Sequence, residues 1–155
     1  MASDLKAIAR RTLEEIFPTG DVAALAQVVH PEVVNHEAPP GAPRGLDGMI
    51  QTMRWLARAF SQRRYELHQV IAEGDTVVVY CTFHARHTGD FMGLAPTNRP
   101  VAVRQVHIVR FQDGKGIEHW AVRDDLGLLR QLGALPSQAG RPVAAGAEPR
   151  PVRLP

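Results

Sequence analysis

The chain has 155 residues, of which 45% are hydrophobic and 22% charged, and this suits one globular domain with a substantial apolar core. Its formal net charge is +2, and the segment after Leu135 accounts for that excess with three arginines and one glutamate. The remaining body is about neutral and lacks the clustered Lys and Arg of a nucleic-acid-binding surface, so no nucleic-acid partner is expected. No segment approaches the apolar length of a membrane span, so no membrane association is expected either.

Cys81 is the single cysteine, which excludes an intrachain disulfide framework. It lies within an apolar run, and this favours a small buried core residue over a nucleophile. Residues 1–11 mix charged and apolar side chains and lack the apolar block of a signal peptide. The sequence therefore predicts a cytoplasmic protein.

The first third of the chain has helical periodicity. Apolar residues recur at helical spacing over 5–16, Asp21 is placed to cap a short helix over 22–28, and a third helix is expected over about 50–60. Between them, residues 35–45 are rich in Pro and Gly, which predicts a structured loop.

The second half changes to the two-residue period of strands. Four antiparallel strands are expected over 65–71, 76–87, 101–111 and 117–122, the last two joined by a turn at Asp113-Gly114. A short helix over 126–132 follows. Helices grouped on one side of a strongly curved antiparallel sheet define an α+β domain that encloses a cavity. We expect this domain to span 1–135, followed by a disordered Pro/Ala/Arg-rich tail over 136–155.

Two polar residues interrupt an otherwise apolar strand face. On 101–111 the odd positions are apolar except Gln105 and His107, which is the pattern of a pocket with a few polar anchors. The alternative is that both side chains bond to neighbouring backbone in a packed core.

The next strand and the turn after it carry further candidates for proton transfer. His119 is placed to share a face with His107, although an ordinary half-exposed strand histidine would give the same pattern. Asp124 and Asp125 precede the last helix, where one of them is expected to be the N-cap and the other is a candidate general acid or base.

No metal or cofactor motif is present in the sequence. His84 and His87 have opposite parity on one strand, and no H-E-x-x-H or Cys/His cluster occurs. Neither G-x-G-x-x-G nor a P-loop occurs, so we expect no metal and no nucleotide cofactor.

Four segments, in this order and spacing, resemble the SnoaL-like polyketide cyclases of the NTF2-like superfamily. Together they cover nearly all of residues 5–135, with Trp55 at the position of a pocket tryptophan. The segments are H-P-x-x-x-N at 30–35, H-T-G-x-x-x-G-x-x-P-T at 87–97, Q-V-H-I-V-R-F with D-G-K at 105–115, and E-H-W with the following aspartates and L-G-L-L-R-Q-L-G at 118–133.

The resemblance implies an NTF2-like (cystatin-like) cone, with three N-terminal helices around a curved antiparallel sheet and assembly into a homodimer or tetramer. It also implies cyclisation or isomerisation of an aromatic polyketide by acid/base chemistry without a cofactor. The residues assigned to catalysis are His107, Asp124 and His119, and those assigned to ligand binding are Asn35, His36, Trp55, His87 and Gln105.

One position departs from the family pattern. The cyclases of the family place an acid/base aspartate directly after the position of Trp120 or very near it, and this chain has Ala121 there. Two alternatives therefore stand beside the cyclase: a component of anthracycline-type hydroxylation that works with a reductase, and a non-catalytic small-molecule-binding module.

Overall fold

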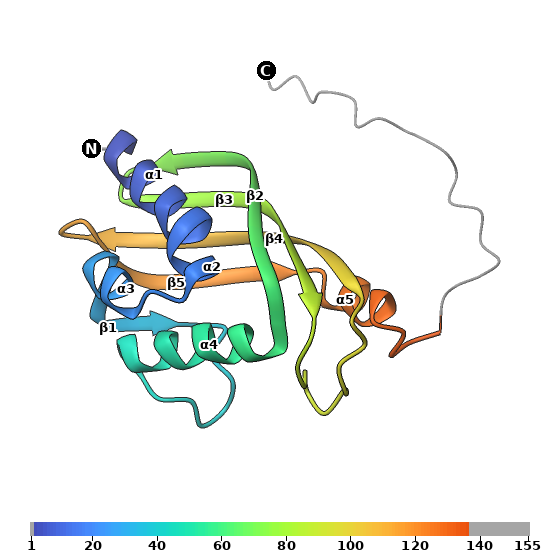
Figure 1. Cartoon of the computed structure of the whole chain (residues 1–155). Coiled ribbons are helices and arrows are strands. Elements are labelled where there is room, and N and C mark those ends of the chain that lie inside the picture. Colours follow the sequence, from blue (N-terminus) through green and yellow to red (C-terminus); the bar gives the residue numbers. More distant parts are fainter. Residues whose placement is uncertain (1, 137–155) are drawn as a thin grey trace, which may run out of the picture.

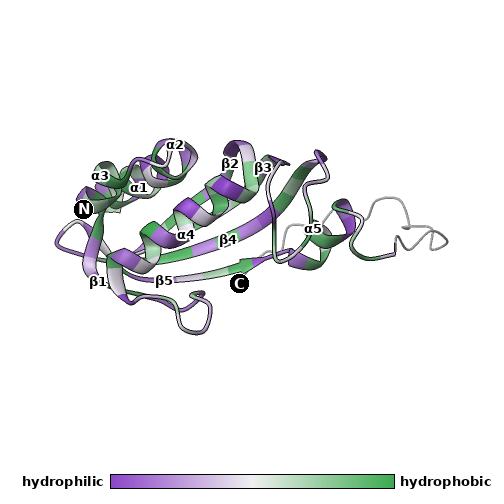
Figure 2. Ribbon diagram, turned by 60° about the horizontal axis from the view of Figure 1, so that its bottom comes forward, coloured by the Kyte–Doolittle hydropathy of each residue, from purple (hydrophilic) through white to green (hydrophobic). Residues whose placement is uncertain are grey.

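A computed structural model describes residues 2–136, so the predicted tail lies outside the described residues except for Pro136 (Figure 1). A curved sheet forms one layer, and Figure 2 shows α1, α3 and α4 together on one side of it. In chain order the elements are α1 (Ala2–Arg11), η1 (Thr12–Ile16), α2 (Phe17–Thr19), α3 (Val22–Val28), β1 (Val29–Asn35), α4 (Gly45–Ala59), β2 (Phe60–Glu73), β3 (Thr76–His87), β4 (Pro100–Gln112), β5 (Lys115–Arg123) and α5 (Asp125–Gln131).

The sheet has five strands in the order β1-β5-β4-β3-β2, and β2 to β5 pair antiparallel. The predicted total of four strands was wrong, because β1 pairs in parallel with β5. Its burial does not alternate, and it contains Pro31, so its sequence has no strand period. Pairing with β5 and packing against α4, both long-range contacts, make it a strand.

Burial alternates strictly along β3, and its buried side chains form the main core with those of β2 and β4. Cys81 belongs to this face and is fully buried, as predicted, and burial raises the pKa of its thiol to about 11. A second apolar cluster joins α3, β1 and α4. The sheet and the helices are thus held together at both ends of the space between them.

The H-T-G motif after β3 has a structural role. The backbone N–H groups of Thr88 and Gly89 both donate to the Ala59 carbonyl at the end of α4, at 3.1 and 3.0 Å. A Cβ atom at Gly89 would collide with the carbonyl oxygen of Arg58, so this close approach requires glycine. The motif fastens the end of β3 to the end of α4.

Candidate active site

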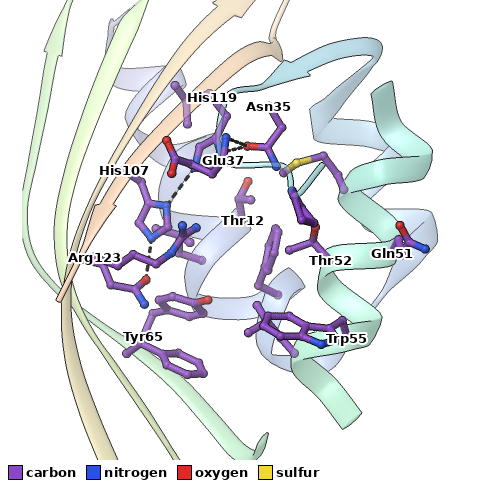
Figure 3. A pocket seen from close by; sticks show the side chains of 18 of the residues that line it. Thr12, Asn35, Glu37, Gln51, Thr52, Trp55, Tyr65, His107, His119 and Arg123 are labelled. Atoms are coloured by element: carbon purple, nitrogen blue, oxygen red, sulfur yellow. Dashed lines mark hydrogen bonds between the residues drawn. The ribbon is translucent and has the colours of Figure 1, made fainter. Parts of the chain in front are cut away.

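A cavity of about 800 Å³ lies between the inner face of the sheet and the helices, a volume typical of small-molecule sites. Its walls are mostly apolar and come from α1, α4 and the inner faces of β2 to β5. In Figure 3, His107 and His119 lie on the sheet side, while Thr52 and Trp55 lie on α4 opposite them. The polar lining residues near the histidines are Asn35, Glu37, Tyr65, Gln105 and Arg123.

A chain of hydrogen bonds runs along the sheet side of the cavity. Asn35 Oδ1 lies 2.8 Å from His119 Nδ1, His119 Nε2 lies 3.1 Å from His107 Nδ1, and Gln105 Oε1 lies 2.9 Å from His107 Nε2. Gln105 and His107 are neighbours on the inward face of β4, and β5 places His119 opposite Val109 on the same face. The pairing of β1 with β5 sets Asn35 beside His119.

Both histidines are held in the neutral form. Burial lowers the pKa of His107 well below its usual value, and the positive charges that His119 and Arg123 can carry lower it further. Burial and the Arg123 guanidinium lower the pKa of His119 to about 4. Two uncharged imidazoles therefore line the cavity near neutral pH, and each has one protonated and one unprotonated ring nitrogen.

The direction of these hydrogen bonds follows from one donor whose identity is certain, a backbone N–H group. The backbone N–H of Glu37 donates to Asn35 Oδ1 at 3.2 Å, which identifies that atom as the amide oxygen. His119 Nδ1–H must then donate to it, and His107 Nδ1–H donates to the lone pair on His119 Nε2. This leaves a lone pair on His107 Nε2, beside which the structure places Gln105 Oε1; with the Gln105 amide turned by 180°, its NH2 group donates to that lone pair. The hydrogen-bonded series from Asn35 through His119 to His107, called the relay below, thus ends in an unprotonated nitrogen on the cavity wall.

Ala121 faces this relay directly. It is the register partner of His107 and is 9% exposed, with His119 two residues before it and Arg123 two residues after it on the inward face of β5. The position of the expected aspartate therefore lies against His107 but carries only a methyl group.

The other predicted site residues divide into two groups. Asn35 and Trp55 line the cavity, and the Trp55 ring contacts Phe91 at 5.3 Å between centroids. His36 is exposed and stacks on Trp120 instead, and His87 is fully buried and bonded to Thr97 without lining the cavity. The structure thus separates two of the five predicted ligand-binding residues from the cavity.

Asp124 is the N-cap of the last helix, which is the first of the two roles expected for the aspartates at this position. Its Oδ1 accepts the Gly127 N–H at 2.9 Å as the N-cap of α5, and the exposed side chain does not line the cavity. Asp125, the other aspartate, is exposed but lines the cavity.

Sequence reasoning missed several polar residues of the lining, and Glu37, Tyr65 and Arg123 are those among them near the histidines. Arg123 could have been found from strand parity, because it lies four residues after His119 and shares its face. Tyr65 begins the predicted strand 65–71, and burial raises the pKa of its phenol, which stays a neutral donor. Glu37 lies in the Pro/Gly-rich loop, where no period indicates direction.

Residues 2–136 include no helix long and apolar enough to cross a membrane. Within the same range, no three His, Cys, Asp or Glu side chains are grouped as a metal site would need.

The curved sheet and the helices that cover it make this an α+β, NTF2-like domain with an internal cavity. A family model described as SnoaL-like polyketide cyclase matches residues 7–132, and the chain belongs to this family. Nogalonic acid methyl ester cyclase of Streptomyces nogalater is 33% identical over 119 residues, which cover 76% of this chain and 89% of the relative.

Solved structures agree with this assignment. TsrD of Streptomyces laurentii superposes with a TM-score of 0.80 at 30% identity, over 87% of this chain and 98% of that one. AclR of Streptomyces galilaeus, described as a putative hydroxylase, superposes with a TM-score of 0.77 at 30% identity, over 88% and 85% of the two chains.

Proposed function

We propose that the protein is a polyketide-tailoring enzyme that closes or isomerises a ring of an aromatic polyketide by acid/base chemistry without a cofactor. The observation that carries the proposal is the neutral His107–His119 pair, which places an unprotonated ring nitrogen at an apolar cavity of suitable size. Family membership and the activity named for the Streptomyces nogalater relative support the substrate class.

In the proposed reaction, His107 Nε2 removes a proton from a carbon between two carbonyl groups. The positive charge spreads as His107 Nδ1–H shifts toward His119 Nε2 and His119 Nδ1–H is held by Asn35. The enolate carbon attacks a second carbonyl of the same molecule, and a carbon–carbon bond forms. The new alkoxide takes the proton back from His107, so the product is an isomer of the substrate.

Within this proposal the histidine relay performs the proton transfer that an aspartate at position 121 would otherwise perform. Asp124 has less support than His107 and His119, because its carboxylate caps α5 and lies outside the cavity lining.

A hydroxylation component working with a reductase is the second candidate. Two observations favour it: Ala121 leaves no carboxylate against His107, and AclR, described as a putative hydroxylase, shares 30% identity with this chain. A non-catalytic binding module would use the same cavity without turnover.

The three functions differ in what the purified protein does to nogalonic acid methyl ester and to its free acid. We expect ring closure of at least one substrate under strict anaerobiosis with a metal chelator present, with a product of unchanged mass. A product one oxygen atom heavier, formed only with reductase and oxygen, would establish the hydroxylase instead. Binding of both compounds with no conversion under either condition would show that the protein is a non-catalytic binding module.

We also propose that the chain assembles as a homodimer or tetramer through the outer face of β4 and β5, and works in the cytoplasm. Val106 and Val122 are register partners on that face, and Val122 is 73% exposed. Tyr80 on β3 is the register partner of Val106, so the three side chains form a row across the centre of the sheet, and contiguous exposed apolar patches mark interfaces. The single cysteine is consistent with a reducing compartment.

Val122→Glu is expected to convert the oligomer to a monomer, because it places a charge within the proposed apolar contact. Sedimentation velocity measures this, and Met92→Glu, at a loop position that is 79% exposed, is the matched control and should keep the native assembly. A wild-type protein that sediments as a monomer at every concentration would contradict the proposed assembly.

A further inference from the structure

Arg123 is the last residue of β5 and the register partner of Gln105 on the inward face of the sheet. Its side chain is partly buried and lines the cavity, and Figure 3 shows it on the same wall as His107 and Tyr65. It also lowers the pKa of both His107 and His119, so its charge acts on the relay. Arg123 is therefore part of the site.

The guanidinium has no partner of its own in the described part of the chain. Among residues 2–136, no carboxylate lies within ion-pair distance and no acceptor is hydrogen-bonded to it. Glu118, another lining residue, is already bonded to Arg110 at 2.8 Å and to His36 at 2.8 Å. Of the groups on the cavity wall, the two imidazoles, the Gln105 amide and the Tyr65 phenol are neutral. The two other lining carboxylates, Glu37 and Asp125, form no ion pair with Arg123.

An unpaired cation in a largely apolar cavity costs free energy unless a ligand supplies the opposite charge. The planar guanidinium donates two parallel hydrogen bonds, which match the two oxygens of a carboxylate. Ala121, which lies between His119 and Arg123 on the inward face of β5, carries no charge that could pair with the guanidinium.

We propose that Arg123 binds a carboxylate of the substrate, so that the cavity selects an acidic aromatic polyketide over its neutral methyl ester. This rests on the proposed function and specifies its substrate. The nogalonic acid methyl ester cyclase relative acts, by its name, on an ester, so the inference separates this chain from it.

Carboxylate binding also acts on the base. While Arg123 is unpaired, its charge opposes protonation of His107 and His119. A bound carboxylate neutralises that charge, so the pKa of the pair rises and His107 accepts a proton more readily. An acidic substrate thus activates the relay that deprotonates it, whereas an ester of the same skeleton leaves the relay opposed by the cation.

The test is a titration by calorimetry with an anthraquinone carboxylate and with the methyl ester of the same compound. The wild-type protein is expected to bind the acid about 10- to 100-fold more tightly than the ester, the range of a charge-assisted hydrogen-bonded pair. Arg123→Gln should remove this preference and leave ester binding nearly unchanged. Arg123→Lys keeps the positive charge but loses the two parallel hydrogen-bond donors, so it should retain part of the preference for the acid.

Arg104→Gln is the matched control, because it removes the same charge from an exposed position on the outer face of β4. It should keep the full preference for the acid. Equal binding of acid and ester by the wild-type protein, or a preference that survives in both folded Arg123 variants, would overturn the inference alone. If neither compound binds, the proposed function fails, and this inference fails with it.

Discussion

His107→Gln is expected to lower kcat/KM for the proposed ring closure by about 10²- to 10⁴-fold, the usual contribution of a general acid/base group. The glutamine amide keeps polar contact with its neighbours but takes up no proton near neutral pH. The loss should appear mainly in kcat, because the removed step is proton transfer and not binding. The rate of product formation, measured by chromatography at saturating substrate, checks this.

Two control variants test whether the loss of activity is specific to His107. His68→Gln removes a histidine that is exposed on β2 and hydrogen-bonded to Thr82, so it should keep the wild-type rate. Asp124→Asn should also keep most of it, because asparagine caps a helix about as well as aspartate does. Full activity of the His107→Gln protein would show that His107 is not the general base. A large loss of activity in Asp124→Asn would show that the Asp124 carboxylate takes part in the reaction.

Acidification from pH 7 to pH 4 is expected to cost about 3 kcal/mol of unfolding free energy through His119 alone. Its pKa in the folded protein is about 4, below the ordinary histidine value of 6.5. Between these values the unfolded chain binds the proton and the folded protein does not, so stability is lost as the pH falls. His107 adds to the loss, because its pKa is shifted in the same direction.

Urea unfolding of the wild-type protein and of His119→Gln at both pH values isolates this contribution. The carboxylates titrate in both proteins, so the difference between the two pH-dependent losses reports on the histidine. We expect the variant to lose about 3 kcal/mol less than the wild type. Parallel pH dependence in the two proteins would show that His119 is not held neutral by the fold.

Much of the site wall was readable from strand parity. Alternation on 101–111 predicted that Gln105 and His107 share a face, and both line the cavity with His119. The same rule extends to Arg123, which lies four residues after His119 on β5 and therefore shares its face. Parity is reliable on β4 because a long, paired strand sends successive side chains to opposite faces.

Strand alternation predicts the direction of side chains only within regular strands. His36 follows β1 where the chain leaves the sheet, and its ring lies on Trp120 instead of facing the cavity. Asp124 follows β5 and precedes α5, where its carboxylate satisfies a free backbone N–H group at the start of the helix.

The sequence by itself determined the α+β class, the periods of β3 and β4, and the inward face that carries Gln105 and His107, because these depend on local alternation and burial. Only the tertiary structure decided that β1 is a strand and that Asn35 therefore meets His119. Those outcomes depend on pairing between segments more than eighty residues apart, for which no local pattern exists.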